Sequence, residues 1–197
     1  MKDTPMTPYR DLHDHIARLE EKGLLVRVDR EIDKDSELHP LVRWQFTGGL
    51  KEEDRKAFLF TNIRNKAGRK YEIPVIVGGL AANRAIYATG MGCDVDGIRD
   101  KWADAIANPV PPREVADAPC HEIVEEGEIL KQEGHGLDLL PIPVSTPGFD
   151  SAPTLSATNV ITADPEDGVQ NMGTYRCGLK APDRLVVRMA TRVGGAG

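Results

Sequence analysis

A proline-rich segment, Asn108–Arg113, constrains the architecture of this chain more than any other stretch. It carries three prolines within the four residues 109–112. Proline lacks a backbone N–H and fixes φ, so the segment cannot continue a helix or lie inside a sheet. The hydrophobic pattern also changes across it. We therefore predict a first domain of residues 1–113 and a second domain of residues 114–197.

Helix-like and strand-like patterns alternate before this boundary, which is typical of an α/β unit. Helices are expected where apolar residues recur every three or four positions, and strands where short β-branched or aromatic runs lie between turn signals. The expected helices are residues 9–22, 35–45, 83–89 and 93–107, and the expected strands are residues 24–28, 57–60 and 73–77. His13 and His15 are two positions apart and point to different faces of the first helix, so we expect both to be solvated rather than to bind a metal.

Short strand-like runs without intervening helices follow the boundary, a pattern that predicts an antiparallel sheet or barrel. The candidate strands are residues 120–126, 129–130, 155–162, 171–180 and 184–189, and residues 137–144 form a proline-interrupted extended segment. The predicted fold class is therefore α+β, with an N-terminal α/β domain followed by the first part of a β-barrel, which would be incomplete in this chain.

Composition excludes several classes of function. The chain has 197 residues, 28% of them charged, and a formal net charge of -6. An acidic chain is poorly suited to broad binding of nucleic acid, which needs clustered Lys and Arg. Its longest apolar runs are too short to span a bilayer, and its start has no signal-peptide pattern, so we expect a cytoplasmic protein. Widely spaced cysteines (Cys93, Cys120 and Cys177) predict reduced structural thiols.

Two glycine- or charge-rich stretches could in principle bind phosphate. Gly78–Gly79 lacks the spacing of a dinucleotide or P-loop motif, and we interpret it as a tight turn between a strand and a helix. The basic residues of segment 64–70 are interpreted as a solvated turn, with a phosphate contact as the less favoured alternative. These basic residues are Arg64, Lys66, Arg69 and Lys70.

The segment Gln170–Arg176 carries the densest functional chemistry of the sequence. The Asn171 amide can bind a hard cation or donate to a phosphate. Gly173 leaves room for a ligand to approach the backbone. Arg176 can hold a carboxylate or phosphate through two parallel hydrogen bonds. The pattern alone leaves two alternatives: an anion site on a β-strand, or an ordinary hairpin strand with Arg176 in a surface ion pair.

Asn171–Arg176 resembles the N-x-G-x-Y-R signature of the UbiD family of reversible decarboxylases. Three other landmarks fall where that family has them: the Tyr9–Leu12 helix start, the Leu139–Pro143 run and the Asp164–Gly168 turn. The resemblance implies an N-terminal α/β domain followed by a split, flavin-reductase-like β-barrel domain. It also implies prenylated FMN as cofactor and Mn²⁺ or Mg²⁺ as metal, with K⁺ as a further candidate.

The resemblance assigns roles to single residues. Asn171 would ligate the metal that bridges to the cofactor phosphate, and Arg176 would lie over the flavin and orient the substrate carboxylate as the catalytic residue. The residues expected to contact the cofactor are Asn171, Met172, Gly173, Thr174, Tyr175 and Arg176. The modified flavin would supply the covalent chemistry with the unsaturated substrate.

Two departures from the family pattern affect the expected function. Residues 189–197 contain no counterpart of the metal-binding histidine that many members carry, and of the family's Glu–Arg–Glu network only Arg176 is present. We therefore expect an N-terminal fragment or split subunit of a carboxy-lyase for an aromatic or α,β-unsaturated acid, inactive without a C-terminal part. It would form a homo-oligomer or a complex with a C-terminal partner. The alternatives are a non-catalytic subunit of the same ancestry that holds flavin phosphate or a partner chain, and an unrelated flavin-reductase-like binding barrel.

Overall fold

A computed structural model describes residues 9–188 of the chain, which form two compact units. The first unit comprises the residues up to 30, together with 41–62 and 74–124. The second comprises residues 31–40 and 63–73 and the chain from 125 onward. The fold class is α+β, as predicted, with small sheets and short helices.

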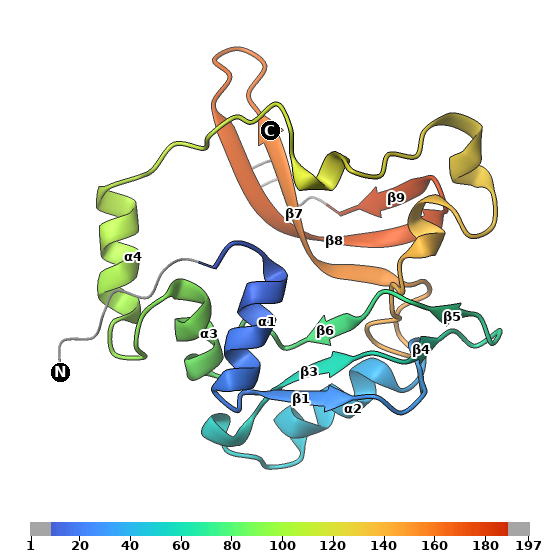
Figure 1. Cartoon of the computed structure of the whole chain (residues 1–197), viewed down its shortest axis with the longest axis horizontal. Coiled ribbons are helices and arrows are strands. Elements are labelled where there is room, and N and C mark those ends of the chain that lie inside the picture. The colour runs from blue at the N-terminus through green and yellow to red at the C-terminus, as the bar shows by residue number, and fades with distance from the viewer. Residues whose placement is uncertain (1–8, 189–197) are drawn as a thin grey trace. The chain divides into compact units, whose positions relative to one another are not determined.

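The first unit is built on a three-stranded mixed sheet with the strand order β1-β3-β6. Strand β1 pairs with β3 in parallel, and β3 pairs with β6 in antiparallel orientation (Figure 1). The elements of this part of the chain are α1 (Leu12–Glu21), β1 (Leu25–Val28), α2 (Leu38–Thr47), η1 (Glu52–Asp54), β3 (Ala57–Phe60), β6 (Val75–Val77), α3 (Arg84–Met91), α4 (Ile98–Ala107) and η2 (Pro119–His121). All four predicted helices are confirmed, with shifted ends.

Helices α1 and α3 pack together over this sheet and form its core. Leu19 on α1 and Ile86 on α3 are fully buried against Ala57 of β3. Each helix begins at a side chain that satisfies a free N–H of its first turn, which is the ordinary role of Asp or Asn at this position. Asp11 accepts from Asp14 N–H at 3.0 Å in α1, and Asn83 accepts from Ile86 N–H at 2.8 Å in α3.

His15 lies inside this core, and the prediction that it is solvated is wrong. Its side chain is 2% exposed, and its Nε2 lies 2.7 Å from the carbonyl oxygen of Gly79. His15 precedes Leu19 by four positions and therefore shares the buried face of α1. Its Nδ1 has no hydrogen-bond partner among the described residues. His13 is exposed, as predicted.

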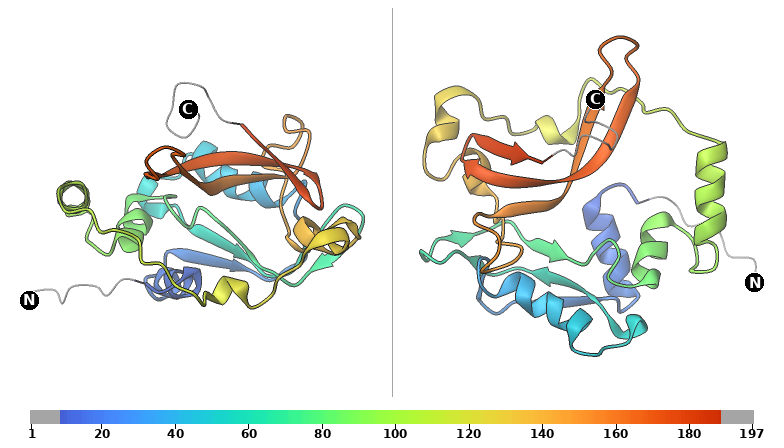
Figure 2. Two further views of the ribbon diagram at one scale, coloured as in Figure 1. Left: turned by 90° about the horizontal axis from the view of Figure 1, so that it is seen from above. Right: turned by 180° about the vertical axis from the view of Figure 1, so that it is seen from behind.

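The second unit contains two three-stranded sheets. One has the order β2-β4-β5 and the other the order β7-β8-β9, in which β8 pairs with both neighbours in antiparallel orientation. Figure 2 shows β7 and β8 as the two long strands of one hairpin. The elements are β2 (Ile32–Asp33), β4 (Ile63–Arg64), β5 (Lys70–Tyr71), η3 (Gly127–Lys131), η4 (Gly136–Leu139), β7 (Thr154–Ala163), β8 (Gln170–Ala181) and β9 (Arg184–Val187).

The strands predicted at residues 120–126 and 129–130 are wrong, because this part of the chain forms short 3₁₀ turns. Proline at the start of η2 and left-handed glycines at 127, 134 and 136 favour tight turns over extended pairing. Glu125 fixes one of these turns. Its carboxylate accepts from Gly136 N–H at 2.7 Å and from His135 Nδ1 at 2.9 Å.

Three of the four basic residues of segment 64–70 lie beside acidic partners within the second unit. Arg64 contacts Glu31 at 2.9 Å and Asp33 at 3.3 Å, and Lys70 also contacts Glu31 at 3.3 Å. Arg69 contacts Asp138 at 3.4 Å. The Arg64 and Lys70 contacts hold the pKa of Glu31 below its ordinary value. These ion pairs favour the interpretation of the segment as a structural turn over a phosphate site.

Across residues 9–188, none of the helices is long and apolar enough to cross a membrane.

Candidate functional site

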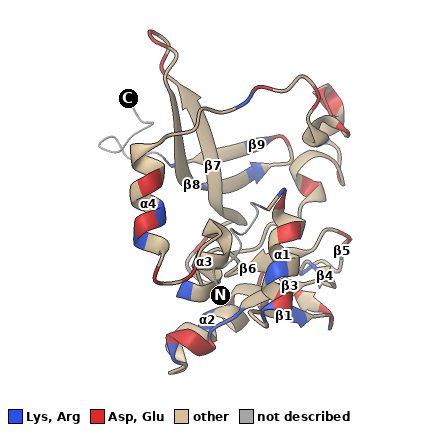
Figure 3. Ribbon diagram, turned by 60° about the vertical axis from the view of Figure 1, so that its left-hand side comes forward, with Lys and Arg blue, Asp and Glu red and all other residues tan. Residues whose placement is uncertain are grey.

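Strand β8 carries all six residues that the sequence singles out. Residues Asn171 to Tyr175 lie opposite β7, and the register pairs Asn171 with Thr162, Gly173 with Val160 and Thr174 with Asn159. Thr174 Oγ1 donates to Asn159 Oδ1 at 3.3 Å across the two strands. The β7–β8 turn is closed by Asp164, whose side chain accepts from Glu166 N–H at 2.8 Å. Figure 3 shows this hairpin tip as an acidic stretch.

Strand alternation divides these six residues between the two faces of the sheet. Successive side chains of a strand point to opposite faces, so Asn171, Gly173 and Tyr175 share one face. Met172, Thr174 and Arg176 share the other face, and all three are exposed. A ligand that contacts both Asn171 and Arg176 must therefore reach around the backbone of β8. The motif does not form one cluster on a single face.

The ring of Tyr175 lies over Gly173. A Cβ placed on Gly173 would come within 2.8 Å of Tyr175 Cζ and 2.9 Å of its hydroxyl oxygen. A glycine two positions away on the same face allows the aromatic ring to cover the backbone. The flat group next to Gly173 in this structure is thus the Tyr175 ring, and a flavin contact with this backbone would require that ring to turn away.

Only part of β8 has strand partners on both edges within the described region. Strand β9 pairs with residues from Cys177 to Ala181, whereas the N-terminal half of β8 pairs with β7 alone. In an antiparallel strand, alternate residues direct their N–H and C=O groups to each edge. The second edge of the motif therefore presents backbone donors and acceptors that are not used by another described strand.

Arg176 forms an ion pair with Asp150, a residue that the sequence pattern did not single out. Its Nη2 lies 3.1 Å from Oδ1 and 3.2 Å from Oδ2 of Asp150. The Arg176 side chain is 53% exposed, whereas that of Asp150 is 14% exposed. Both Asp150 contacts use one guanidinium nitrogen. Nε and Nη1 of Arg176 make no hydrogen bond within residues 9–188.

Arg188 is a second basic residue beside this pair. Its N–H approaches the carbonyl oxygen of Arg176 at 3.5 Å, which continues the β8–β9 register by one position. Residues that lie directly opposite in an antiparallel pair share a face. Arg188 was missed at the level of sequence because only the β8–β9 pairing brings it beside Arg176.

Asn171 would supply only part of a metal site. Its side chain is exposed, and the position opposite it is Thr162. Hard cations such as Mg²⁺ and Mn²⁺ favour about six oxygen ligands, several of them carboxylates. No cluster of three or more His, Cys, Asp or Glu side chains that could hold a metal ion occurs among residues 9–188. The stretch 189–197, where the family's histidine was sought, lies outside the described residues.

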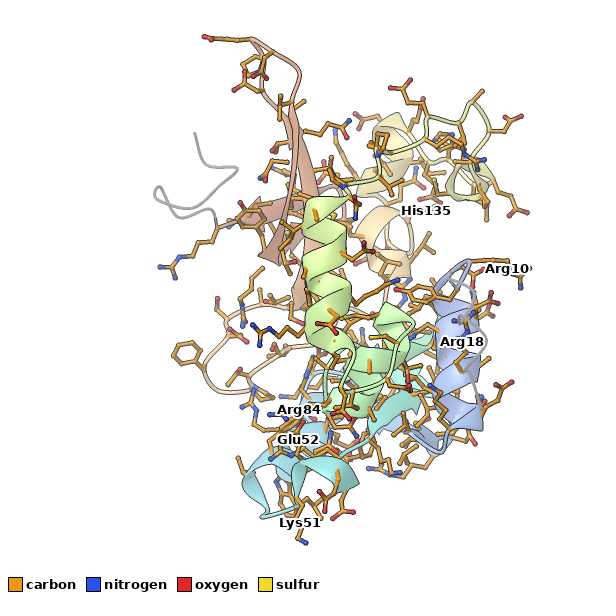
Figure 4. All side chains as sticks on the ribbon, turned by 90° about the vertical axis from the view of Figure 1, so that its left-hand side faces the viewer. Arg10, Arg18, Lys51, Glu52, Arg84 and His135 are labelled. Atoms are coloured by element: carbon orange, nitrogen blue, oxygen red, sulfur yellow. The ribbon has the colours of Figure 1, made fainter. Side chains whose placement is uncertain are left out.

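The Gly78–Gly79 turn does not offer an alternative phosphate site. Glu52 occupies the start of α3, because its Oε1 accepts from Arg84 N–H at 3.0 Å and lies 3.6 Å from Arg84 Nε. Figure 4 shows these two labelled side chains next to each other. A carboxylate at a helix N-terminus takes the place that an anion would otherwise favour.

Two family models match the sequence in succession. Residues 16–106 match the N-terminal domain of 3-octaprenyl-4-hydroxybenzoate carboxy-lyase, and residues 113–197 match its Rift-related domain. Both are models of UbiD proteins. The Asn171–Arg176 motif lies in the second match.

Solved UbiD-class and decarboxylase structures resemble this chain. HmfF from Pelotomaculum thermopropionicum, in complex with FMN, is 33% identical with a TM-score of 0.73, over 92% of this chain and 37% of HmfF. The vanillic acid decarboxylase of Sedimentibacter hydroxybenzoicus, in closed form, is 26% identical with a TM-score of 0.75, over 94% of this chain and 38% of its own. The 3,4-dihydroxybenzoic acid decarboxylase of Klebsiella pneumoniae is 26% identical with a TM-score of 0.76, over 94% of this chain and 38% of its own.

This chain therefore spans less than two fifths of the length of each of these three enzymes.

Proposed function

Because this chain belongs to the UbiD family, we propose that it carries the flavin-phosphate and substrate-carboxylate side of a reversible, non-oxidative decarboxylase site. The substrate class is an aromatic or α,β-unsaturated carboxylic acid. The observation that carries the proposal is the N-x-G-x-Y-R segment on β8. Within residues 9–188, two guanidinium nitrogens of its arginine make no hydrogen bond, and one edge of the segment is not paired with a strand.

Arg176 is the residue proposed to act on the substrate. A substrate carboxylate can accept hydrogen bonds from a guanidinium group, and Nε and Nη1 of Arg176 are the two nitrogens that Asp150 does not contact. Holding the carboxylate in one orientation places the bond that breaks in a fixed geometry, which lowers the entropic part of the barrier. Met172 and Ile161 are exposed on the same face and directly opposite each other. They provide apolar surface for the unsaturated part of the acid.

The cofactor proposed for this site is prenylated FMN. When bound, it supplies the electron sink for loss of carbon dioxide. The relevant residues of this chain are the backbone of Gly173 to Tyr175 and the Thr174 hydroxyl, which can donate to and accept from a flavin and its phosphate. HmfF structures in complex with FMN and with prFMN support a flavin as the cofactor class.

Asn171 is the proposed metal residue. The amide oxygen of Asn171 fits one position of a Mn²⁺ or Mg²⁺ site that also uses the cofactor phosphate as ligand. The metal would neutralise the phosphate charge next to β8. Because Asn171 is the single proposed ligand from the described residues, we expect little affinity for Mn²⁺ without the cofactor.

A second candidate function is a non-catalytic subunit that holds flavin phosphate or a partner chain. It is favoured by the edge of β8 at residues 170–176, which no strand within residues 9–188 covers and which can receive another strand as well as a ligand. Related structures include a dimeric form of HmfF and the vanillic acid decarboxylase ShVdcCD with a truncated ShVdcD. By analogy, assembly of this chain with a copy of itself or with a C-terminal partner is part of the proposal.

Reconstitution distinguishes the two functions. The purified chain is titrated with FMN and with prenylated FMN in the presence of Mn²⁺, alone and with a polypeptide that covers the remaining length of HmfF. Carbon dioxide release from cinnamic, vanillic and 3,4-dihydroxybenzoic acids is then measured.

Release that depends on prenylated FMN and is lost in Arg176→Ala supports the carboxy-lyase. Flavin binding without release under both conditions supports the binding subunit. Absence of flavin binding under both conditions contradicts both functions.

A further inference from the structure

We propose that Asp150 is a positioning residue for Arg176, which it holds in one orientation so that Nε and Nη1 remain for a carboxylate. This inference rests on the proposed function for its consequence, although the orientation itself can be measured without turnover. The hydrogen bonds of Asp150 within residues 9–188 go to Arg176 and to Thr146 of its own loop. Asp150 would therefore act through the arginine.

The two side chains of this ion pair differ in exposure, and Asp150 is the more restrained of the two. Both carboxylate oxygens lie within 3.2 Å of the same Arg176 nitrogen, Nη2. Asp150 is 14% exposed while Arg176 is 53% exposed. A long arginine side chain has many rotamers when it is solvated, and fixing it in one of them costs side-chain entropy. A largely buried carboxylate at its tip provides that restraint before the substrate arrives.

Asp150 is held in turn by its own loop. Its Oδ2 accepts from Thr146 N–H at 2.7 Å, and its backbone N–H donates to the carbonyl oxygen of Thr146 at 2.9 Å. The ends of the loop meet where Thr154 N–H donates to the carbonyl oxygen of Pro143 at 2.9 Å. The carboxylate is therefore anchored at both its side chain and its backbone.

The loop and Arg176 are attached to the same strand. Leu179 N–H on β8 donates to the carbonyl oxygen of Pro153 at 2.9 Å. The register of β7 against β8 shifts between Leu155 and Thr158, directly opposite Arg176. A β-bulge of this kind redirects side chains and is frequent next to functional sites. The loop that carries Asp150 is thus tied to the strand that carries Arg176.

If this pair had only a structural role, its loss would change the free energy of unfolding little, because an ion pair with a half-exposed member contributes little to stability. A positioning role instead predicts a selective loss in catalysis, because misorientation of a substrate clamp lowers kcat. Removing the Asp150 charge also removes a repulsion toward the substrate carboxylate, which offsets the weaker orientation in the ground state and keeps KM nearly constant.

The test uses Asp150→Asn, Asp150→Glu and a matched control, Asp183→Asn. In Asp150→Asn the amide oxygen of the new side chain can still accept from Thr146 N–H, so the loop is retained while the charge is lost. Asp183 pairs with Arg184 at 3.2 Å, with exposures of 20% and 72% for the two side chains, and so provides an equivalent ion pair away from the motif.

Order of the Arg176 side chain is measured by ¹⁵N relaxation of its Nε–Hε group, assigned with Arg176→Lys. We expect the order parameter to fall from about 0.8 to below about 0.6 in Asp150→Asn, to recover in Asp150→Glu and to remain unchanged in Asp183→Asn. In the enzyme loaded with prenylated FMN, Asp150→Asn should lower kcat about tenfold or more while KM stays within about threefold.

An unchanged order parameter in Asp150→Asn overturns the inference, as does an unchanged kcat in an active enzyme. If the loaded wild-type enzyme shows no turnover with any acid, the proposed function fails, and the order parameter alone decides the role of Asp150.

Discussion

Two glycines of the second unit, Gly136 and Gly173, differ in the atoms that an added Cβ would meet. Gly136 has φ +56°, and a Cβ there would lie 2.6 Å from the carbonyl oxygen of Pro182 and 3.2 Å from that of Leu130. Both obstacles are backbone atoms, which cannot rotate away. At Gly173 the three nearest atoms all belong to the Tyr175 side chain, which can rotate.

We therefore expect Gly136→Ala to lower the free energy of unfolding by about 2 kcal/mol or more. Gly173→Ala should change it by less than about 1 kcal/mol, because alanine also favours an extended strand more than glycine does. Urea denaturation of the two variants measures this difference. An equal loss in both would show that the Tyr175 ring cannot move.

Glu125 makes the stability of its turn dependent on pH. The N–H of Gly136 and the ring of His135 hold the pKa of Glu125 below its ordinary value of 4.5. A carboxylate with a lowered pKa in the folded state stabilises the fold at neutral pH, and this contribution is lost as pH falls from 4.5 through the lowered value.

The difference in free energy of unfolding between the wild type and Glu125→Gln should consequently be larger at about pH 6 than at about pH 3. Chemical denaturation at several pH values measures it. Lys131 pairs with Glu128 at 2.7 Å, an exposed ion pair of the same region. Glu128→Gln should show a much smaller change, and an equal change in both variants would contradict the role of Glu125.

The contribution of a helix N-cap to stability depends on the burial of the capping residue as well as on its type. Asn83 is 5% exposed, and besides capping α3 through Oδ1 it donates from Nδ2 to the carbonyl oxygen of Arg55 at 2.6 Å. Asp11 caps α1 from an exposed position. Loss of a buried polar group leaves its partners unsatisfied, which costs more than loss of a solvated one.

Asn83→Ala should accordingly lower the free energy of unfolding by about 2 kcal/mol, and Asp11→Ala by about 0.5–1 kcal/mol. Asn83→Asp retains the cap but loses the donor to Arg55 and should fall between them. Thermal or urea unfolding of the three variants gives the order. A milder effect of Asn83→Ala than of Asp11→Ala would contradict the assigned contacts.

Elements with a clear periodic pattern could be predicted from the sequence, whereas the proline- and glycine-rich part could not. Strand β8 and helix α1 follow local patterns of alternation and helical spacing. The turns around η3 depend on Glu125 reaching His135, ten positions away, which a local pattern does not report. His15 was placed in solvent although its spacing from Leu19 puts it on the buried face of α1, because the carbonyl oxygen of Gly79 that satisfies its polar ring lies sixty-four positions away.

The candidate site was predictable in part for the same reason. The six residues from Asn171 to Arg176 were found as one contiguous motif, and their separation onto two faces follows from strand alternation alone. Asp150 lies twenty-six positions before Arg176. Its role requires the loop of residues 143–154 to close against β8, which no short sequence window contains.

At the scale of the whole molecule, the second unit joins segments that lie far apart in the sequence. Lys34 is 5% exposed, and its Nζ donates to the carbonyl oxygen of Ile142 at 2.8 Å; Arg69 pairs with Asp138 at 3.4 Å. Each contact joins residues on opposite sides of Asn108–Arg113. We propose this proline-rich segment as the boundary between the sequence domains 1–113 and 114–197, with residues 31–40 and 63–73 of the first sequence domain contributing to the second compact unit.

Cleavage at a protease site inserted into Asn108–Arg113 should leave the two pieces associated in size-exclusion chromatography. Lys34→Ala should weaken the association, because it removes the buried donor to the carbonyl oxygen of Ile142, which lies on the other piece. Separation of the wild-type pieces at micromolar concentration would contradict the assignment of residues 31–40 and 63–73 to the second unit.

At the scale of the whole molecule, the proposed activity depends on Arg176 to hold the substrate carboxylate. A reversible decarboxylase exchanges the carboxyl carbon of its substrate with dissolved carbon dioxide, so the most direct measurement is incorporation of ¹³C from labelled bicarbonate into the unreacted acid, followed by mass spectrometry. The protein is loaded with prenylated FMN and Mn²⁺ and completed with the partner polypeptide. We expect exchange in the wild type, a loss of about 100-fold or more in Arg176→Ala and near-normal exchange in Asp183→Asn. Exchange that persists at the wild-type rate in Arg176→Ala would contradict this role of Arg176.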